Sequence, residues 1–425
     1  MIQEKLLNYI EDNKETLFTM LSDLIKINTE NDGSGKESIN ETPLSEYLRD
    51  AFKAYGISSE LYSPENVDGI QSHRDYAETR KVPKRHNITA TIKGTKGKKS
   101  LMFAGHLDTV PAGDLSLWTV DAFKGIIKDG KIWGRGACDD KYSLATMLFL
   151  AKAFHDLGIK PKNNILFTGY VDEEFGGGNG ALASVLKYPC DLYVNMDCKD
   201  FEIWNTASGG QRLAIVIKHP EPLDNCEKII EGLYLAKKEI DKFGTKRQDE
   251  LRENPLYHGS YIPDTAFRYM RIESGVEVNA KNVGVIDYAY YTDKDKDFVK
   301  TEEDKMLKRI EEKIAPLGLV IDKVNYGSRF FGYGEISKDN ENIVLLQESA
   351  KDVSGRKLTP VPSCLSDLSL FLANAKNRAF SFGIGRSFAK YGGAHLPDEF
   401  IECDTILEFA RIAGTFLLRW DEAND

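Results

Sequence analysis

Short apolar runs alternate with amphipathic stretches over the first half of the chain, and this alternation restricts the fold more than any other feature. The runs have the length and composition of β-strands, and they read ISSELYS, NITATIKG, SLMFAGH, NNILFTGYV and CDLYVNMD. Helical periodicity covers Gln3 to Ile27, Thr42 to Tyr55 and Tyr142 to Leu157. This order predicts an α/β domain with a central mixed sheet, in which ligands gather at the strand ends.

The pattern changes after Gly209 and Gly210. The predicted elements there are, in order, strand 212–218, helix 225–243, strand 267–272, strand 283–291, helix 301–315 and strand 319–326. This βαββαβ order is the ferredoxin-like plan, and the charged run DKDKD at 293–297 is interpreted as a solvated loop inside it. The α/β pattern resumes near residue 337. We therefore expect an α/β domain in two parts, 1–208 and 332–425, interrupted by an inserted domain over 209–331.

Composition excludes several classes of protein. A chain of 425 residues is too long for one ordinary core, and 56 basic against 66 acidic residues give a net charge of −10, the wrong sign for a protein that grips nucleic acid. The most apolar stretch, LATMLFLAKAF, is too short to cross a bilayer, and the N-terminus lacks the pattern of a signal peptide. Six cysteines without a CxxC pair favour reduced thiols. We expect a cytoplasmic protein with neither nucleic acid nor membrane as a partner.

Two of the seven histidines stand in informative positions, and His106 is the first. It ends an apolar strand, and Asp108 follows two residues later, so both side chains project to the same side of an extended segment. This spacing is typical of a metal-bound imidazole with a carboxylate behind it. A structural histidine with satisfied hydrogen bonds is the alternative interpretation.

Two clusters of acidic residues also follow strands or precede helices. Asp139 and Asp140 are adjacent in WGRGACDDK, directly before a predicted helix, and the apolar strand NILFTGY is followed by Asp172, Glu173 and Glu174. Neighbouring carboxylates repel each other, so a cation, a helix N-terminus or water must offset the cost of holding them together. An exposed capping pair and a solvated loop are the alternatives.

Two further candidates complete the set. Asp197 ends the strand that reads YVNMD, and His395 lies in the loop GGAHLPDEF before the last helix. Neither is persuasive alone. Together, two histidines and several carboxylates near strand ends supply the donors of a divalent-metal site with mixed nitrogen and oxygen ligands.

These segments resemble a known family. In order and spacing, AGHLDTVPAG, DGKIWGRGACDDK, VDEEFGG, VNMD, SDLSLF and GGAHLPDEFI are similar to the motifs of the dinuclear zinc metallopeptidases and deacylases that include acetylornithine deacetylase, succinyl-diaminopimelate desuccinylase, aminoacylase, carnosinase-type dipeptidases and glutamate carboxypeptidase. The resemblance covers about 1–208 and 332–425. The inserted segment resembles, more weakly, the family's lid and dimerisation domain. The resemblance implies a homodimeric, metal-dependent hydrolase that cleaves an amide bond in a small peptide or an N-acyl amino acid.

The resemblance also implies a role for each matching residue. His106 and Asp197 hold one divalent ion, Glu174 and His395 hold the other, and Asp139 bridges the two ions. Asp108 orients His106, and Glu173 is the general base. Zinc is the expected metal, with cobalt or manganese as alternatives. The Asp139–Asp140 peptide bond is expected to be cis.

The lid contributes substrate contacts in this family, and their counterparts are less clear here. His219 is the nearest match to the lid histidine that stabilises the oxyanion, with His258 as the second candidate. Asn279 matches the asparagine that holds the substrate carboxylate, and the backbone of Gly393 and the side chain of Ser366 are further expected contacts. The family's arginine is replaced by DYAYYTDKDK, so Lys294 or Arg329 is the expected substitute.

The altered lid leaves a second class of function open. A catalytically silent metal-binding scaffold, or a peptide-binding protein of the same fold, keeps the same ligands without turnover. Within the enzyme hypothesis, peptidases and deacylases share every catalytic residue, so both remain candidates.

Overall fold

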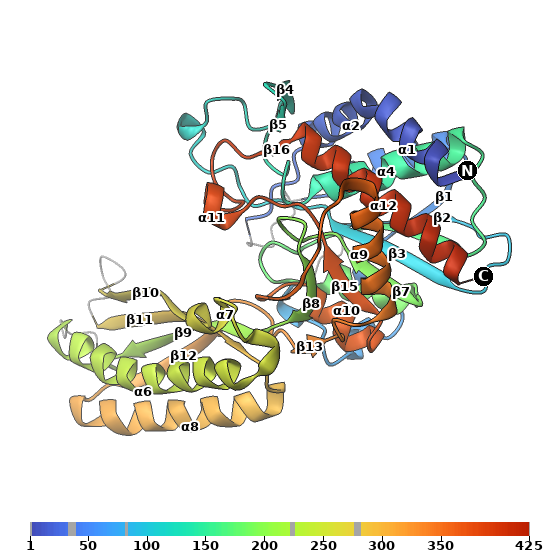
Figure 1. The fold of residues 1–425 in the computed structure, drawn as a ribbon. Coiled ribbons are helices and arrows are strands. Elements are labelled where there is room, and N and C mark those ends of the chain that lie inside the picture. Colours follow the sequence, from blue (N-terminus) through green and yellow to red (C-terminus); the bar gives the residue numbers. More distant parts are fainter. Residues whose placement is uncertain (1, 33–39, 81–83, 222–225, 276–281, 425) are drawn as a thin grey trace. The chain divides into compact units, whose positions relative to one another are not determined.

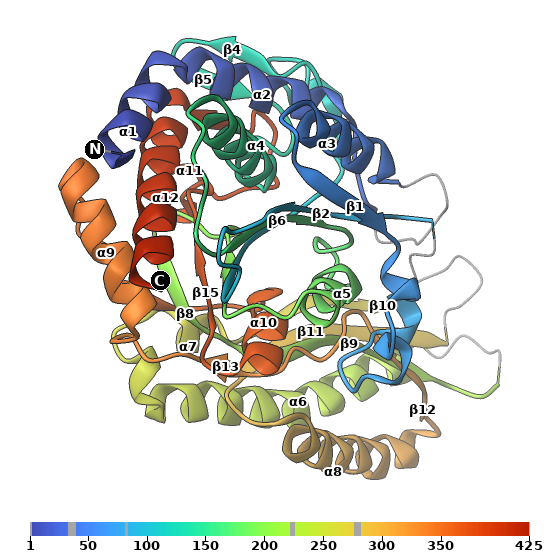
Figure 2. The same cartoon turned by 90° about the vertical axis from the view of Figure 1, so that its right-hand side faces the viewer.

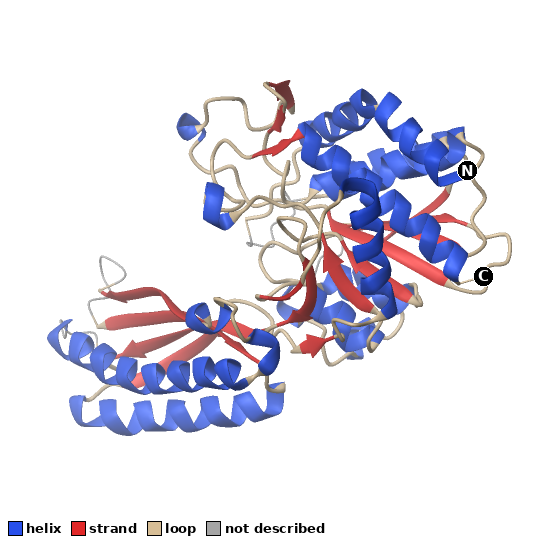
Figure 3. Ribbon diagram, viewed as in Figure 1, coloured by secondary structure: helices blue, strands red, loops and turns tan. Residues whose placement is uncertain are grey.

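A computed structural model describes residues 2–32, 40–80, 84–221, 226–275 and 282–424 (Figures 1 and 3). The chain divides into two compact units. Unit 1 consists of Met1–Asn205, Ile336–Pro360 and Leu370–Asp425. Unit 2 consists of Thr206–Glu335 and Val361–Ser369.

The helices of the N- and C-terminal parts are α1 (Ile2–Asp12), α2 (Lys14–Lys26), α3 (Thr42–Ala54), α4 (Lys141–Asp156), α5 (Asn179–Lys187), α9 (Glu341–Ser354), α10 (Leu368–Ala375), α11 (Phe388–Tyr391) and α12 (Cys403–Ala423). Those of the middle part are α6 (Cys226–Glu253), α7 (Ile262–Thr265) and α8 (Lys296–Ile314). Within the described ranges, none of the helices combines the length and the apolar composition that crossing a bilayer requires.

A large mixed sheet forms the centre of the α/β part of the chain. Its strand order is β1-β2-β6-β3-β7-β15-β8-β13, with β14 paired to β8. Its strands are β1 (Ser58–Tyr62), β2 (Asn87–Ile92), β3 (Ser100–His106), β6 (Asn164–Tyr170), β7 (Leu192–Asn195), β8 (Ile203–Ala207), β13 (Gly334–Glu335), β14 (Pro360–Ser363) and β15 (Ala379–Phe382). The neighbours β6, β3, β7 and β15 run parallel, whereas β1, β2 and β8 pair antiparallel. Parallel strands end at a common edge, which therefore collects the residues that follow them.

Helices cover both faces of this sheet (Figure 2). Phe103 of β3 packs against Phe416 of α12 on one face, and Tyr170 of β6 packs against Phe371 of α10 on the other. All four side chains are buried. Burying a large apolar side chain stabilises a fold by about 1.5–3 kcal/mol, so strands that are apolar on both faces need helices on both sides.

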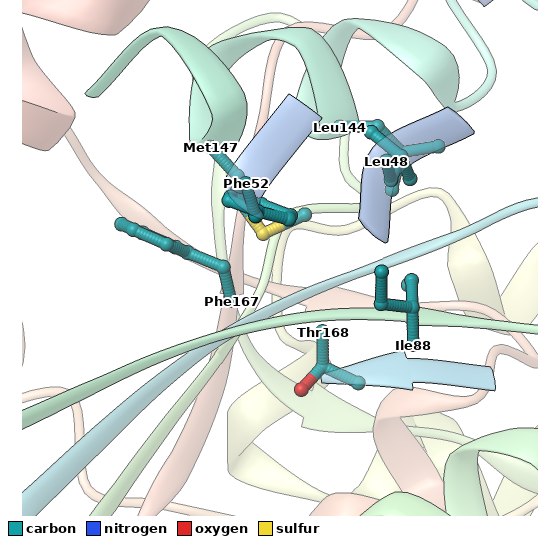
Figure 4. Close-up of a pocket in the computed structure, with 8 residues that line it drawn as sticks. Leu48, Phe52, Ile88, Leu144, Met147, Phe167 and Thr168 are labelled. Atoms are coloured by element: carbon teal, nitrogen blue, oxygen red, sulfur yellow. The ribbon is translucent and has the colours of Figure 1, made fainter. Parts of the chain in front are cut away.

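The layer between the sheet, α3 and α4 is almost completely filled. A cavity of about 10 Å³ remains there, and Figure 4 shows the side chains that surround it. Its lining consists of Leu48, Phe52, Ile88, Leu144, Met147, Phe167, Thr168 and Gly169. A void of this size has at most the volume of about one water molecule. The helix α4 is therefore held tightly against the sheet.

A small sheet in the order β16-β5-β4 packs against α2 and α12. It comprises β4 (Ile126–Lys128), β5 (Lys131–Trp133) and β16 (Phe400–Glu402), all antiparallel. Its pairing of β5 with β16 joins segments that are more than 260 residues apart in the chain and fixes the residues just before β16 beside those just after β5.

Unit 2 contains a four-stranded antiparallel sheet in the order β10-β11-β9-β12. Its strands are β9 (Gly209–Lys218), β10 (Phe267–Ser274), β11 (Val283–Thr292) and β12 (Val320–Tyr326). Figure 1 shows α6 and α8 together on one face of this sheet. Buried side chains from β9 and β11, such as Ile215, Tyr288 and Tyr290, form one core with those of the two helices.

The structure differs from the sequence predictions in three places. The first predicted helix is two helices that meet at Asn13, whose side-chain amide donates to the Tyr9 carbonyl at 2.8 Å and so competes with the helical hydrogen bond. The helix predicted to end at residue 243 continues to Glu253. The run DKDKD is not a loop throughout, because the Asp295 carboxylate accepts from the Phe298 N–H and caps α8, which begins at Lys296.

The packing of α6 on β10 leads to a prediction about Gly244. A Cβ at this buried position would lie 2.3 Å from the Phe267 ring. Alanine gains up to about 1 kcal/mol of helix propensity over glycine, but overpacking costs about 1–3 kcal/mol. We expect Gly244→Ala to lower the free energy of unfolding in urea, whereas Thr245→Ala, at the exposed neighbouring position of the same helix, should raise it slightly. A stabilised Gly244→Ala variant would contradict the packing described here.

Candidate metal centre

Four neighbouring parallel strands bring the candidate ligands to one edge of the large sheet. His106 is the last residue of β3, and Glu173 and Glu174 follow β6. Asp197 follows β7, and His395 lies in the segment between β15 and β16. These strands are adjacent, so residues that are up to 289 positions apart lie close together. Because β3, β6 and β7 are followed by polar residues, their apolar pattern stops where the site begins.

Asp139 comes from a turn between β5 and α4 rather than from a strand. The turn contains Gly134 and Gly136, whose φ angles are +145° and +87°, a region that disfavours other residues. The Asp139–Asp140 peptide bond is cis, as the family resemblance implied. Asp139 Oδ1 lies 2.9 Å from Nε2 of His106, and Oδ2 lies 3.0 Å from Nε2 of His395. Each carboxylate oxygen therefore faces one histidine.

The two histidines are held differently. His106 is fully buried, and its Nδ1 lies 2.9 Å from the main-chain oxygen of Asp108. Because a carbonyl oxygen only accepts, Nδ1 donates its proton in this contact, and the ring is held with Nε2 directed to the site. His395 has a φ angle of +68°, its side chain is 48% exposed, and its Nε2 also lies 3.0 Å from Glu174 Oε2.

Asp108 supports the opposite side of the site with its carboxylate. Its Oδ1 accepts from the N–H of Glu173 at 3.0 Å, and Oδ2 accepts from the N–H of Glu174 at 3.2 Å. The same carboxylate lies 3.7 Å from His106 Nδ1. Asp108 therefore contacts the segments of three candidate residues, and it is itself fully buried.

A buried network of charged side chains lies behind Asp108. Asn31 donates to Asp108 at 2.9 Å and to Asp172 at 3.1 Å, and Asp172 also pairs with Arg80 and Arg85. Arg85 binds Glu41 through two guanidinium nitrogens. Buried carboxylates of this kind are tolerated because each has a cation or an N–H group beside it.

The acidic groups of the site itself strongly influence one another. Burial and the neighbouring charge of Asp139 raise the pKa of Asp197 to about 7. Burial alone would raise the pKa of Asp139 as well, but the hydrogen bonds with His106 and His395 outweigh it and lower that pKa. The pKa of His395 is raised to about 11 by Asp139 and Glu174, against the effect of burial. Negative charge thus exceeds positive charge here, and cations relieve the excess.

The donor set fits divalent cations. Ligand atoms of His106, Glu173 and Asp197 lie within 4.8 Å of one another, and so do those of His106, Asp139 and Glu174. His395 joins the second group through its contacts with Asp139 and Glu174. Imidazole nitrogen and carboxylate oxygen together are the donors that zinc, cobalt and manganese accept.

The residues predicted from the lid lie in unit 2 or outside the described residues. His219 Nδ1 accepts from the Glu221 N–H at 3.3 Å, and a Cβ at Gly318 would lie 3.2 Å from its Nε2. His258 is exposed. Asn279 falls outside the described ranges.

The other expected substrate contacts have local partners. Lys294 pairs with Asp293 at 2.9 Å, and the Arg329 guanidinium lies 5.7 Å from the Phe331 ring. The side chain of Ser366 is buried in unit 2. In unit 1, the Gly393 N–H donates to the Ser387 carbonyl at 3.3 Å.

Apart from Asp108, the sequence motifs did not reveal the residues that support the site. Glu41, Arg80 and Arg85 lie in segments without a motif, and Asn31 precedes the undescribed residues 33–39. Glu399 stands inside the motif GGAHLPDEF without an assigned role. Its signal is an acidic residue at the start of the apolar strand β16, where a buried carboxylate requires partners.

Comparison with known proteins gives consistent results. A model for the peptidase family M20/M25/M40 matches residues 102–419. An uncharacterized metallohydrolase of Methanocaldococcus jannaschii is 35% identical over 167 residues, which are 39% of this chain and 38% of that protein. The succinyl-diaminopimelate desuccinylase of Wigglesworthia glossinidia brevipalpis is 32% identical over 187 residues, 44% of this chain and 46% of that protein. The matches span less than half the length of these curated relatives.

Two solved structures are similar over nearly the whole chain. Human carnosine dipeptidase 1 has a TM-score of 0.73 and 15% identity, with 99% of this chain and 100% of that chain covered. The di-peptidase Dug1p from Saccharomyces cerevisiae has a TM-score of 0.74 and 15% identity, with 100% and 99% covered. At this identity the likeness establishes the fold, and it confirms the predicted α/β architecture with a large mixed central sheet.

The network behind Asp108 leads to a prediction about Arg85. Burial raises the pKa of Glu41 to about 7 even against the opposing effect of Arg85. Arg85→Met leaves Glu41 and Asp172 with less compensation, and we expect it to lower the free energy of unfolding by about 3–5 kcal/mol at pH 8.5. The exposed Arg49, which pairs with Asp50, provides a control, because Arg49→Met should cost less than about 1 kcal/mol.

The same variant should show a characteristic pH dependence. A carboxyl whose pKa is higher in the folded than in the unfolded protein favours the folded state below its unfolded pKa, and this contribution falls as the pH rises through the folded pKa. Removal of Arg85 extends this effect to higher pH. The deficit measured by urea unfolding should therefore shrink from pH 8.5 to pH 5, and a deficit that grows on acidification would contradict the buried network.

Proposed function

Because the chain belongs to the peptidase family M20/M25/M40, we propose that it is a metal-dependent hydrolase that cleaves an amide bond in a small peptide or an N-acyl amino acid. The observation that carries this proposal is that His106, Glu174 and His395 converge on the Asp139 carboxylate, while Glu173 and Asp197 lie beside His106. A scaffold or a peptide-binding protein without turnover requires no general base beside the ligands.

We assign the ligands of two divalent ions from this arrangement. His106 and Asp197 would hold one ion, Glu174 and His395 would hold the other, and Asp139 would bridge them. Divalent ions held in this way polarise a carbonyl group and lower the pKa of water. Zinc is our first choice, and cobalt and manganese suit the same donors.

The protein's own groups then account for orientation and proton transfer. Glu173 takes a proton from the attacking water and delivers it to the leaving amine nitrogen. Asp108 supports this role, because its carboxylate binds the backbone N–H groups of Glu173 and Glu174 and so fixes where both side chains begin. The Nδ1–H of His106, held by the main-chain oxygen of Asp108, keeps Nε2 directed to the site.

The relatives indicate the range of substrates without selecting one. They include a succinyl-diaminopimelate desuccinylase, a protein of Dictyostelium discoideum named probable carboxypeptidase S-like 2, and dipeptidase structures. We propose the shared chemistry, hydrolysis of an amide beside an amino acid carboxylate, for this chain. His219, Asn279 and Gly393 remain our candidates for substrate contacts. A cytoplasmic location is consistent with six cysteines that are free thiols.

We further propose that the βαββαβ segment, residues 209–331, is a ferredoxin-like lid and dimerisation domain inserted between the two parts of the catalytic domain, residues 1–208 and 332–425. The strand order of unit 2 and its two helices on one face support this proposal. Its edge strand β10 exposes 48% of Met270 and 44% of Ile272. An unpaired edge with exposed apolar side chains is suited to pairing with a second copy.

The dimer proposal is tested by the mass of the protein in solution. Sedimentation equilibrium should give twice the chain mass of 47.8 kDa for the wild type. We expect Ile272→Glu to shift this equilibrium towards the monomer, while Val344→Glu, an exposed position on α9 in unit 1, should leave it unchanged. A monomeric wild type, or equal behaviour of the two variants, would count against β10 as the interface.

The hydrolase proposal is tested on protein loaded with Zn²⁺, Co²⁺ or Mn²⁺ and assayed with panels of dipeptides and N-acetyl amino acids. The expected result is amide hydrolysis that a chelator abolishes and added metal restores. Metal-loaded protein that is silent across both panels would favour the scaffold.

Variants of the neighbouring residues Glu173 and Glu174 distinguish the role of general base from that of metal ligand. Glu173→Gln keeps the shape of the side chain but cannot take a proton, so we expect bound metal to be retained and kcat to fall at least about 10²-fold. Glu174→Gln, the matched control, and His106→Ala should instead lower the metal content measured by elemental analysis. Near-normal turnover of Glu173→Gln would remove Glu173 from the mechanism.

A further inference from the structure

Glu399 is a buried carboxylate that the mechanism does not use, and all of its hydrogen bonds described here go to one turn. Its Oε1 accepts from the Cys138 N–H at 2.8 Å, and its Oε2 accepts from the Gly136 N–H at 3.1 Å and from Arg135 at 2.6 Å. Its main-chain oxygen accepts from the Gly134 N–H at 2.9 Å. Glu399 therefore binds four donors of the turn that ends at Asp139, one each from Gly134, Arg135, Gly136 and Cys138.

The turn depends on this support. Gly134 and Gly136 have positive φ angles, and a Cβ at Gly136 would lie 2.8 Å from a methyl group of Thr109. Side chains are therefore excluded from these positions, and the turn is held through hydrogen bonds donated by its backbone N–H groups. The Cys138 N–H is directly adjacent to Asp139, so fixing it limits the directions in which the Asp139 side chain points.

Arg135 extends the contact to a third segment. It is 1% exposed, donates to the Pro111 carbonyl at 3.3 Å, and its guanidinium lies 5.3 Å from the Trp118 ring. Pro111 and Trp118 belong to the loop that follows His106 and Asp108. The pair of Arg135 and Glu399 thus joins the segments of His106, Asp139 and His395.

The neighbouring residue strengthens the same junction. The Asp398 carboxylate accepts from the Thr119 N–H at 2.7 Å and from its hydroxyl at 2.9 Å. The turn directly follows β5 and Glu399 directly precedes β16, so the pairing of these two strands holds the turn and Glu399 next to each other (Figure 1). Three chain segments with candidate ligands are therefore tied within a few residues of one ion pair.

From this geometry we propose that Glu399 is a positioning residue, whose carboxylate holds the Gly134–Cys138 turn so that Asp139 presents one oxygen to His106 and the other to His395. The inference rests on the proposed function for its consequence, because the direction of Asp139 matters to a bridged pair of ions. It assigns Glu399 no contact with substrate or metal. Glu399 acts through the position of Asp139.

The test uses Glu399→Gln in the full-length protein. The amide NH₂ group replaces one acceptor oxygen, so either the Gly136 and Arg135 donors or the Cys138 donor lose their partner. In metal-free protein, hydrogen exchange of the peptide that covers 134–141 should become at least about tenfold faster. The dissociation constant for Co²⁺ should rise about 10- to 100-fold, with an altered visible absorption spectrum of the bound ion.

A matched control removes another ion pair of unit 1. Glu408 of α12 binds Arg356 through two hydrogen bonds of 2.8 and 2.7 Å. We expect Glu408→Gln to leave the exchange of 134–141, the Co²⁺ affinity and the spectrum unchanged. Glu399→Asp keeps the charge beside Arg135 but is one methylene shorter, so it should recover thermal stability more completely than Co²⁺ affinity, and it replaces Glu399→Gln if that variant does not fold.

The outcomes separate this inference from the proposed function. Unchanged exchange and unchanged Co²⁺ affinity in the Glu399 variants would overturn it. If the wild type binds Co²⁺ but hydrolyses no amide, the proposed function fails while the positioning role is decided by affinity and exchange. If the wild type binds no Co²⁺, the exchange of 134–141 alone decides whether Glu399 holds the turn.

Discussion

Repulsion among buried carboxylates is the constraint on which the rest of this structure depends. Asp139, Glu174 and Asp197 converge with two histidines, and burial together with the charge of Asp139 raises the pKa of Asp197. Such a cluster costs folding energy unless cations or N–H donors compensate it. The outer carboxylates Asp108, Asp172 and Glu399 bind N–H groups and arginines. The carboxylates of Asp139, Glu174 and Asp197 lie near the imidazoles at the end of the sheet. A bound divalent cation would compensate the negative charge that the imidazoles do not.

Topology is what makes this concentration of charge possible. The parallel strands β6, β3 and β7 end at one edge, so each contributes a polar residue without interrupting its own apolar interior. His395 and Asp139 come from loops instead. Asp139 lies in the turn between β5 and α4, and it therefore depends on the two glycines and on Glu399 for its position.

The sequence predicted the parts of the molecule that local patterns determine. Strand periodicity located β3, β6 and β7, and the acids at their ends marked the candidate ligands. It did not predict the break at Asn13 or the capping by Asp295, because both depend on side-chain hydrogen bonds that compete with regular helical patterns. The supporting residues Glu41, Arg85 and Glu399 escaped prediction for a different reason. Their partners lie at least 44 residues away in the chain, and a buried ion pair leaves no periodic signal.

The two histidines of the site differ in burial and in how their backbone is held. His106 is enclosed by the sheet, with Nδ1 bound to the main chain of Asp108 and no exposed surface. His395 lies on a loop, in a backbone conformation that few residues adopt, and its side chain is 48% exposed. Both approach the same carboxylate, so Asp139 lies between one fully buried imidazole and one that is about half exposed. The two ions that we propose would therefore differ in how far their histidine ligand is enclosed by the protein.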